Sequence, residues 1–294
     1  TGDALAVSTY LEEAGAYNRL YFAFGDLIAG TAEPKHYDGT YLDPVSVTPN
    51  ATALVLGQSV DAGNVNSGTR YGVFMYRTRT GHIAGFTRAA MASVTLPDST
   101  RRVHVSGLPA VTSIPLNVTD IIVAFTLSGS TQDDDFFYIA ATASIGGVSM
   151  TTTMIPVRTD DGTPDPVYNQ TAVFNFTDLY LAASTNVTRG QDKLKLAAQA
   201  SVAYIPSLDR LAWAGEQGFG GFRLSEPGDP ETVYSNTGYV QPGPNDGQRP
   251  IGTVELENGE ILFLKQRSAY FPVPNTGDPT TWELKQKWGK VGPC

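Results

Sequence analysis

Turn residues interrupt this chain at short intervals, and that spacing constrains its fold more than any other feature. Apolar or alternating runs are separated by Gly, Asn, Asp or Pro about every 10–20 residues. The predicted strands include residues 70–77, 102–105, 120–127, 136–141, 148–153, 251–256 and 261–265. Short strands at this spacing are typical of all-β sandwiches and propellers.

Helical periodicity is scarce by comparison. The best helix candidate, residues 191–204, also fits the start of a strand. Residues 70–77 are apolar or aromatic at every position but the ends, which predicts a strand covered on both faces and followed by a turn at Thr80-Gly81-His82. Asn258-Gly259 lies between two strand-like runs and predicts a hairpin of type I′.

Two stretches without regular structure divide the chain. Residues 159–166 contain two prolines and a glycine among acidic residues, which predicts a linker or a long loop. A second boundary is expected within residues 43–50. The segment between them has about 100 residues, the usual size of an immunoglobulin-like sandwich. The predicted segments are 1–47, 48–158 and 159–294.

Charge and composition exclude several classes of protein. The net charge of −9 and the pI near 4.8 argue against binding nucleic acid by bulk phosphate neutralisation. Charged residues make up only 17% of the chain, too few for a coiled coil or an acidic disordered tail. The one cysteine, Cys294, cannot form an intrachain disulfide. No run approaches the ~20 apolar residues that span a bilayer, so no membrane contact is predicted.

Two stretches outside the central segment resemble each other. Residues 18–25 and 209–215 each begin with a turn residue, continue with Arg-Leu and an aromatic strand, and end in Gly. A repeated unit of this kind is typical of propeller blades, which bury their faces only against neighbouring blades.

These motifs and others occur in a recognisable order. Residues 18–25 are followed by Pro34-Lys35-His36-Tyr37-Asp38-Gly39-Thr40. The central segment contains 68–71, 76–82, 105–109 and 118–122. The last part contains 209–215, 223–231, 259–265 and 268–270. The order resembles a family of tailed-bacteriophage virion proteins in which propeller blades flank an inserted fibronectin-III-like sandwich. Residues 123–127 and 149–154 depart from the pattern of that sandwich.

The resemblance implies an all-β fold, an incomplete propeller-like domain with an inserted immunoglobulin/fibronectin-III-like sandwich. It implies a non-enzymatic structural protein in the virion, at the tail or the portal–tail junction. Its expected partners are other virion proteins and further copies of itself in a ring or tail assembly, and no sequence-specific nucleic acid. Because residues 291–294 look like the middle of a strand–turn unit, the chain is also expected to be a fragment or to be completed by a neighbour.

Chemically reactive constellations are sparse in the sequence. His36, His82 and His104 are isolated from one another, and no Ser nucleophile motif occurs, so neither an enzyme nor a cofactor is predicted. The acidic runs 133–135 and 160–161 fit solvated turn tips, with a calcium site as the alternative.

Five residues are predicted to mediate interactions. Tyr37 and Tyr41 flank Asp38, and Tyr234 and Tyr239 lie in the long, proline-rich stretch 233–250. Exposed aromatics of this kind stack on sugar rings or anchor an assembly interface. Core packing is the commoner role for any one aromatic residue.

Asn-x-Thr sequons support a competing identity. They occur at Asn50, Asn117, Asn169, Asn175 and Asn186. The alternative is a secreted or surface carbohydrate-binding glycoprotein, lectin-like or adhesin-like and extracellular. A polysaccharide-degrading propeller is a third hypothesis, supported only by the general suitability of the fold. Coincidence in a Thr-rich β protein is the favoured explanation of the sequons.

Overall fold

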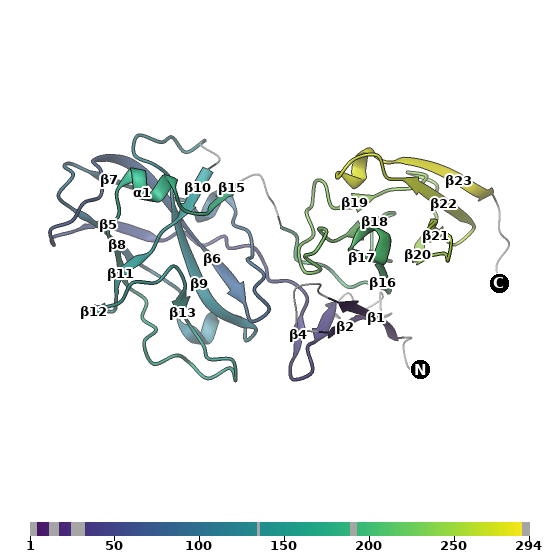
Figure 1. Ribbon diagram of the computed structural model, residues 1–294, viewed down its shortest axis with the longest axis horizontal. Coiled ribbons are helices and arrows are strands. Elements are labelled where there is room, and N and C mark those ends of the chain that lie inside the picture. Colours follow the sequence, from purple (N-terminus) through teal and green to yellow (C-terminus); the bar gives the residue numbers. More distant parts are fainter. Residues whose placement is uncertain (1–4, 12–17, 25–32, 134–135, 189–192, 290–294) are drawn as a thin grey trace. The chain divides into compact units, whose positions relative to one another are not determined.

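The chain folds into antiparallel sheets arranged in two compact units (Figure 1). A computed structural model describes residues 5–11, 18–24, 33–133, 136–188 and 193–289. Strands account for 43% of the chain and helices for 7%, in five sheets of which none closes within these ranges, and this confirms the predicted all-β class. Residues 47–192 form the contiguous unit, and residues 1–46 with 193–294 form the split unit.

Two sheets make up the contiguous unit. The larger sheet has the order β15 (Asn186–Thr188), β10 (Phe136–Ile139), β9 (Val118–Phe125), β6 (Gly68–Thr78) and β7 (Ala92–Leu96), with β13 (Ile155–Pro156) also paired to β9. The smaller sheet has the order β12 (Val148–Ser149), β11 (Thr142–Ile145), β14 (Ala172–Phe174), β8 (Arg102–Ser106) and β5 (Val55–Ser59). Short helices occur at η1 (Arg88–Ala90), η2 (Val111–Ser113) and α1 (Asp178–Ala182).

Strand β6 is buried on both faces, as its continuous apolar sequence predicts. Phe74 belongs to the core shared by the two sheets, together with Val103 of β8 and Phe174 of β14. Val73 and Met75 point the other way, into a second cluster that includes residues of the 83–91 connection. Alternate residues of one strand therefore supply two separate cores.

The contiguous unit extends to residue 192, whereas the sequence placed a boundary at 158/159. Strand β14 pairs with β8 and β11, and β15 pairs with β10, so both strands complete the sheets of this unit. Residues 159–166 form a local turn in which the Thr159 amide donates to the Thr163 carbonyl at 2.9 Å. The pairs that β14 and β15 form connect strands far apart in sequence. The composition of residues 159–166 therefore gives no information about them.

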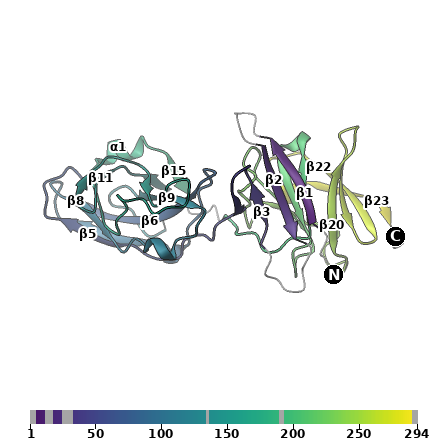
Figure 2. The same cartoon turned by 90° about the horizontal axis from the view of Figure 1, so that it is seen from below.

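Three four-stranded sheets of the same topology make up the split unit (Figure 2). The first sheet comprises β1 (Leu5–Leu11), β2 (Asn18–Phe24), β3 (Lys35–Tyr37) and β4 (Leu42–Pro44). The second comprises β16 (Ser201–Ile205), β17 (Arg210–Ala214), β18 (Phe222–Leu224) and β19 (Tyr239–Val240). The third comprises β20 (Pro250–Glu255), β21 (Ile261–Lys265), β22 (Ser268–Val273) and β23 (Glu283–Gly289). In each sheet, neighbours in sequence are neighbours in space.

The three sheets pack on one another in a repeated way. β16 lies against β1 and β2 of the first sheet, and β20 lies against β16 and β17 of the second. Leu211 and Trp213 of β17 enter a core with Tyr21 of the first sheet. Ala212 and Ala214 face the opposite core, which contains Phe263 of the third sheet. The second sheet is therefore buried on both faces.

The two sequence stretches that resemble each other occupy equivalent positions. Residues 18–25 contain β2 and residues 209–215 contain β17, and each is the second strand of its sheet. Arg19 and Arg210 begin the matching Arg-Leu pairs, and both are buried.

Each of these arginines bonds to the sheet that follows its own. Arg19 Nη1 donates to Glu231 Oε1 at 3.3 Å, between the third and fourth strands of the second sheet. Arg210 Nη2 donates to the Gly277 carbonyl at 2.9 Å, between the third and fourth strands of the third sheet. The repeat in sequence is therefore also a repeat in the contacts between sheets.

One local prediction needs correction, and the structure decides between two alternatives at another position. The hairpin between β20 and β21 forms, but its turn is not type I′, because Gly259 has φ +79° whereas Asn258 is not among the described residues with positive φ. The Gly259 amide donates to the Leu256 carbonyl at 2.8 Å, which fits a type I turn followed by a glycine bulge. Described residues 193–200 are not helical, and β16 begins at Ser201, so the strand alternative is the correct one there.

Candidate functional site

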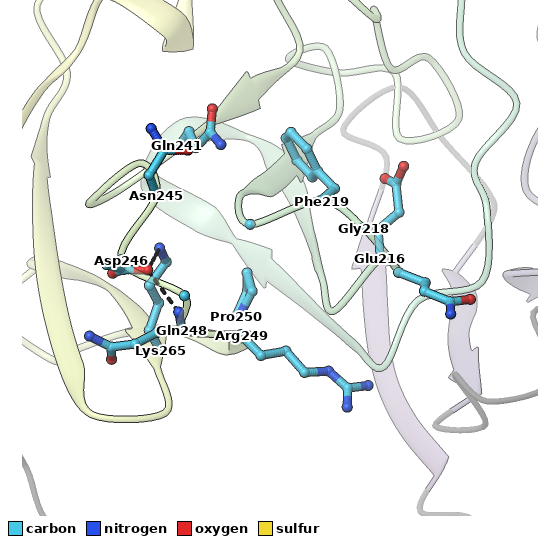
Figure 3. A pocket seen from close by; sticks show the side chains of 13 residues that line it. Glu216, Gly218, Phe219, Gln241, Asn245, Asp246, Gln248, Arg249, Pro250 and Lys265 are labelled. Carbon is cyan, nitrogen blue, oxygen red and sulfur yellow. Dashed lines mark hydrogen bonds and ion pairs between the residues drawn. The ribbon is translucent and has the colours of Figure 1, made fainter.

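A pocket of about 710 Å³ lies between the second and third sheets (Figure 3). The β17–β18 connection forms one wall and the β19–β20 connection forms another. The lining residues are Glu216, Gln217, Gly218, Phe219, Gly220, Gln241, Asn245, Asp246, Gly247, Gln248, Arg249, Pro250 and Lys265. The stretch 233–250, singled out from the sequence as a functional loop, therefore supplies about half of the lining.

A buried ion pair braces one wall of this pocket. Lys265 has a side chain only 1% exposed, and its Nζ donates to Asp246 Oδ1 at 2.9 Å and to the Gly243 carbonyl at 3.3 Å. Burial raises the pKa of Asp246, but the Gln248 amide and Lys265 lower it by more, so the net pKa lies below its ordinary value. Asp246 is thus held as a carboxylate, which suits ion pairing and does not suit a general acid.

Behind the opposite wall, Arg223 contacts two of the lining residues, Glu216 and Phe219. Arg223 makes a two-point ion pair with Glu216, at 2.8 Å from Nε and 3.2 Å from Nη2. Its guanidinium carbon lies 3.9 Å from the centre of the Phe219 ring. The Phe219 ring in turn meets Tyr239 edge to face at 5.8 Å. These contacts fix the orientation of the aromatic ring that lines the pocket.

The remaining polar groups are suited to binding rather than to proton transfer. Gln248 accepts hydrogen bonds at Oε1 from the Arg267 amide and the Ser268 hydroxyl, at 2.9 and 3.0 Å. Among the described residues, no hydrogen bond or ion pair engages the side chains of Gln241 or Arg249. With both lining carboxylates neutralised by cations, the pocket presents amides, one guanidinium and one ring to a ligand.

Of the five predicted interaction residues, Tyr239 lies nearest this pocket, because it contacts Phe219. Tyr234 lies in the same connection, and its backbone pairs with Lys193. Burial, followed by the carboxylates of Glu226 and Asp229, raises the pKa of Tyr234 to about 12. Tyr234 is thus half-buried beside acidic groups.

The other three predicted residues lie in the β3–β4 hairpin of the first sheet. Asp38 Oδ1 accepts hydrogen bonds from the Thr40 and Tyr41 amides, each at 2.8 Å, so this carboxylate stabilises the turn itself. The Tyr37 hydroxyl donates to the Gly39 carbonyl at 2.6 Å. The two groups of predicted residues thus belong to different sheets.

Sequence reasoning did not single out the ion pairs of the pocket. Lys265 ends an otherwise apolar strand at an inward-facing position, and this was a usable signal for a buried charge. Glu216 and Arg223 flank the glycine-rich connection 218–221, where Gly221 allows close approach to β19, since a Cβ there would lie 2.6 Å from the Val240 carbonyl oxygen. The interpretation of these glycines as permitting close strand contact is consistent with that geometry.

The acidic runs behave as turn tips where they are described. Asp133 is exposed and pairs with Arg88 at 2.9 Å, while residues 134–135 lie outside the described ranges. Asp161 accepts from the Thr159 hydroxyl at 2.5 Å and from the Thr163 amide at 2.9 Å, and these bonds lower its pKa to about 2. Among described residues no group of three His, Cys, Asp or Glu side chains could hold a metal ion.

Two of the five sequon asparagines are buried in the contiguous unit. Asn50 is 4% exposed and Asn117 is 2% exposed. Asn50 Nδ2 donates to the carbonyls of Thr52 and Phe74, each at 3.0 Å. These two side chains therefore act within the fold and are not accessible for a glycan, which weakens the sequons as an argument for a glycoprotein.

Comparison with known proteins gives no further identification. No protein-family model matches the chain, and no curated protein is significantly similar to it in sequence. Within the described ranges, no helix is long and apolar enough to cross a membrane. The resemblance to phage virion proteins therefore stays a prediction.

Proposed function

We propose that this chain is a non-enzymatic structural and assembly protein of a tailed-phage virion, located in the tail or at the portal–tail junction. The split unit is an open β-propeller of three blades. The contiguous unit is an immunoglobulin/fibronectin-III-like sandwich inserted after the first blade. Its partners are other virion proteins and further copies of the chain.

The observation that carries this proposal is the order of the sheets along the chain. One four-stranded sheet precedes a two-sheet unit, and two more four-stranded sheets of the same topology follow it. Blades flanking an inserted sandwich are what the sequence resemblance implies. The repeated arginine contacts of Arg19 and Arg210 support the same interpretation, because they tie each sheet to the next in the same way.

A rigid scaffold is the function that such an arrangement supports best. Buried cores join the three sheets of the split unit, which suits a platform that holds its shape under load. The loops of the sandwich are available to present side chains to neighbouring subunits or to a host surface.

Labelling of purified particles tests this proposal. An antibody raised against the chain should bind density-purified particles of the phage that encodes it, and immunogold should lie at the tail or the tail junction. Presence of the protein in the lysate but not in the particles would contradict the proposal. That result would favour the carbohydrate-binding alternative, for which the pocket with Phe219 and its amides is the candidate site.

A further inference from the structure

Charges around the pocket between the second and third sheets are matched at two carboxylates. Glu216 pairs with Arg223 at 2.8 Å, and Asp246 pairs with Lys265 at 2.9 Å. Arg249 also lines the pocket and is exposed, but within the described ranges no hydrogen bond or ion pair engages its guanidinium. Among the residues that the structure describes, the lining therefore has a cation for which the protein supplies no counter-ion.

Side-chain amides make up much of the other polar lining. Gln217 comes from the β17–β18 connection, and Gln241, Asn245 and Gln248 come from the β19–β20 connection. Gln248 accepts two hydrogen bonds at Oε1, and no bond between described residues engages its Nε2, which is left to donate to a ligand. A primary amide both donates and accepts, as a hydroxyl group does. Amides on two walls of one pocket therefore suit a ligand that carries several hydroxyls.

Phe219 adds a flat apolar surface that is held in place. The guanidinium carbon of Arg223 lies 3.9 Å from the centre of the ring, and Tyr239 meets the ring edge to face at 5.8 Å. A ligand can therefore meet only the other face or the remaining edge of the ring. The ring belongs to one wall and Arg249 to another (Figure 3). The volume of about 710 Å³ lies within the ~300–1,000 Å³ of small-molecule sites.

We propose that this pocket binds an acidic saccharide, a short chain of pyranose rings that carry carboxylates. The carboxylate pairs with Arg249, the apolar C–H face of a ring packs on Phe219, and the hydroxyls bond to the amides. A neutral sugar would leave Arg249 without a counter-ion, whereas a small carboxylate would use neither the ring nor the amides. The inference goes beyond the proposed function, because a scaffold requires no small ligand, and it holds wherever the chain is located.

Isothermal titration calorimetry of the full chain tests the site with two probes. These are trigalacturonate and its methyl ester, which keeps the rings and hydroxyls but has no charge. The acid should bind about 10-fold more tightly than the ester, because hydrogen bonds between ions are about twice as strong as neutral ones. Arg249→Gln should reduce the affinity for the acid to that for the ester. Arg267→Gln is the matched control, since Arg267 is exposed but does not line the pocket, and both affinities should stay unchanged.

Phe219→Leu separates recognition of the sugar from attraction of its charge. It should weaken binding of the acid and of the ester by the same factor, about 3-fold or more, because both lose the aromatic surface. Unchanged tryptophan fluorescence establishes that the variants are folded.

The wild-type chain by itself can overturn the proposal. An acid that binds no better than its ester, or no better than acetate, contradicts a site for acidic sugars. Equal losses in Arg249→Gln and Arg267→Gln would show attraction by general charge and would also overturn it. Particle labelling does not depend on ligand binding, so this proposal and the proposed function fail separately.

Discussion

Buried arginines tie distant stretches of this chain together. Arg70 is completely buried, donates to the Asn66 carbonyl at 2.8 Å and to Asp178 Oδ1 at 3.2 Å, and lies 5.3 Å from the centre of the Phe176 ring. The sequence marks it only as the polar end of an apolar run. Its charge partner Asp178 lies 108 positions away, and no local pattern could have identified it.

Replacing Arg70 tests how much burial matters for an ion pair. Arg70→Met keeps most of the volume but removes the cation paired with Asp178 and the donor to the Asn66 and Thr126 carbonyls, so the free energy of unfolding should fall by about 2–3 kcal/mol. Arg77→Met on the same strand is the control, because the Arg77–Asp120 pair is shorter, at 2.9 Å, but 30% and 17% exposed. Arg77→Met should lower the free energy of unfolding by less than about 1 kcal/mol. Urea unfolding followed by far-UV circular dichroism measures both, and equal losses would contradict the argument.

Local sequence patterns were equally unable to identify the ion pairs of the candidate site. The sequence favoured tyrosines in turns, and Tyr239 does lie beside the pocket. The groups that shape the pocket are ion pairs such as Arg223–Glu216, whose members are brought together by a hairpin. Residue type alone could not pair them, because the chain has 20 basic and 29 acidic side chains to combine.

At the scale of elements, alternation and turn residues located the longer strands and missed many of the short ones. All seven strand runs named from the sequence overlap observed strands. The turn type at Asn258-Gly259 was wrong, because Asn-Gly is compatible with a type I turn and bulge as well as with type I′. The short helix α1 was not predicted, since five residues give too little periodicity to detect.

Glycine at the end of β17 is required by two separate constraints. Gly215 has φ +89°, and a Cβ there would lie 2.5 Å from the Ala200 Cβ. Gly218 has φ +78° but open space around it. Gly218→Ala should therefore lower the free energy of unfolding by only about 1 kcal/mol, because alanine is strained at a positive φ. Gly215→Ala should cost at least about 2 kcal/mol more, because the chain must also move to relieve the clash. Tryptophan fluorescence during urea unfolding measures the stability of both variants. Similar unfolding midpoints would contradict the predicted clash with Ala200.

At the scale of the whole molecule, the two units have separate cores and different spectroscopic probes. All three tryptophans, Trp213, Trp282 and Trp288, belong to the split unit. Circular dichroism reports strands in both units. The sequence anticipated one inserted segment but not its full extent, since the last strands of the insert pair only with partners distant in sequence.

We expect the two units to unfold as separate cooperative transitions. Circular dichroism should show two steps in urea, and tryptophan fluorescence should follow only one of them. Arg70→Met should shift the transition of the contiguous unit, which fluorescence does not follow, to lower urea concentration. Gly215→Ala should shift the transition of the split unit, which fluorescence does follow. A single transition seen identically by both probes would show that the units unfold together.

The split unit also has a consequence for synthesis on the ribosome. Its first sheet is translated before the entire contiguous unit, yet Tyr21 and Ala23 are buried only when β16 and β17 arrive afterwards. The contiguous unit, by contrast, contains all its strands within one uninterrupted stretch. The nascent chain must therefore carry an apolar sheet without its cover while the inserted unit is being made, and that interval is when association with the wrong partner is most favoured.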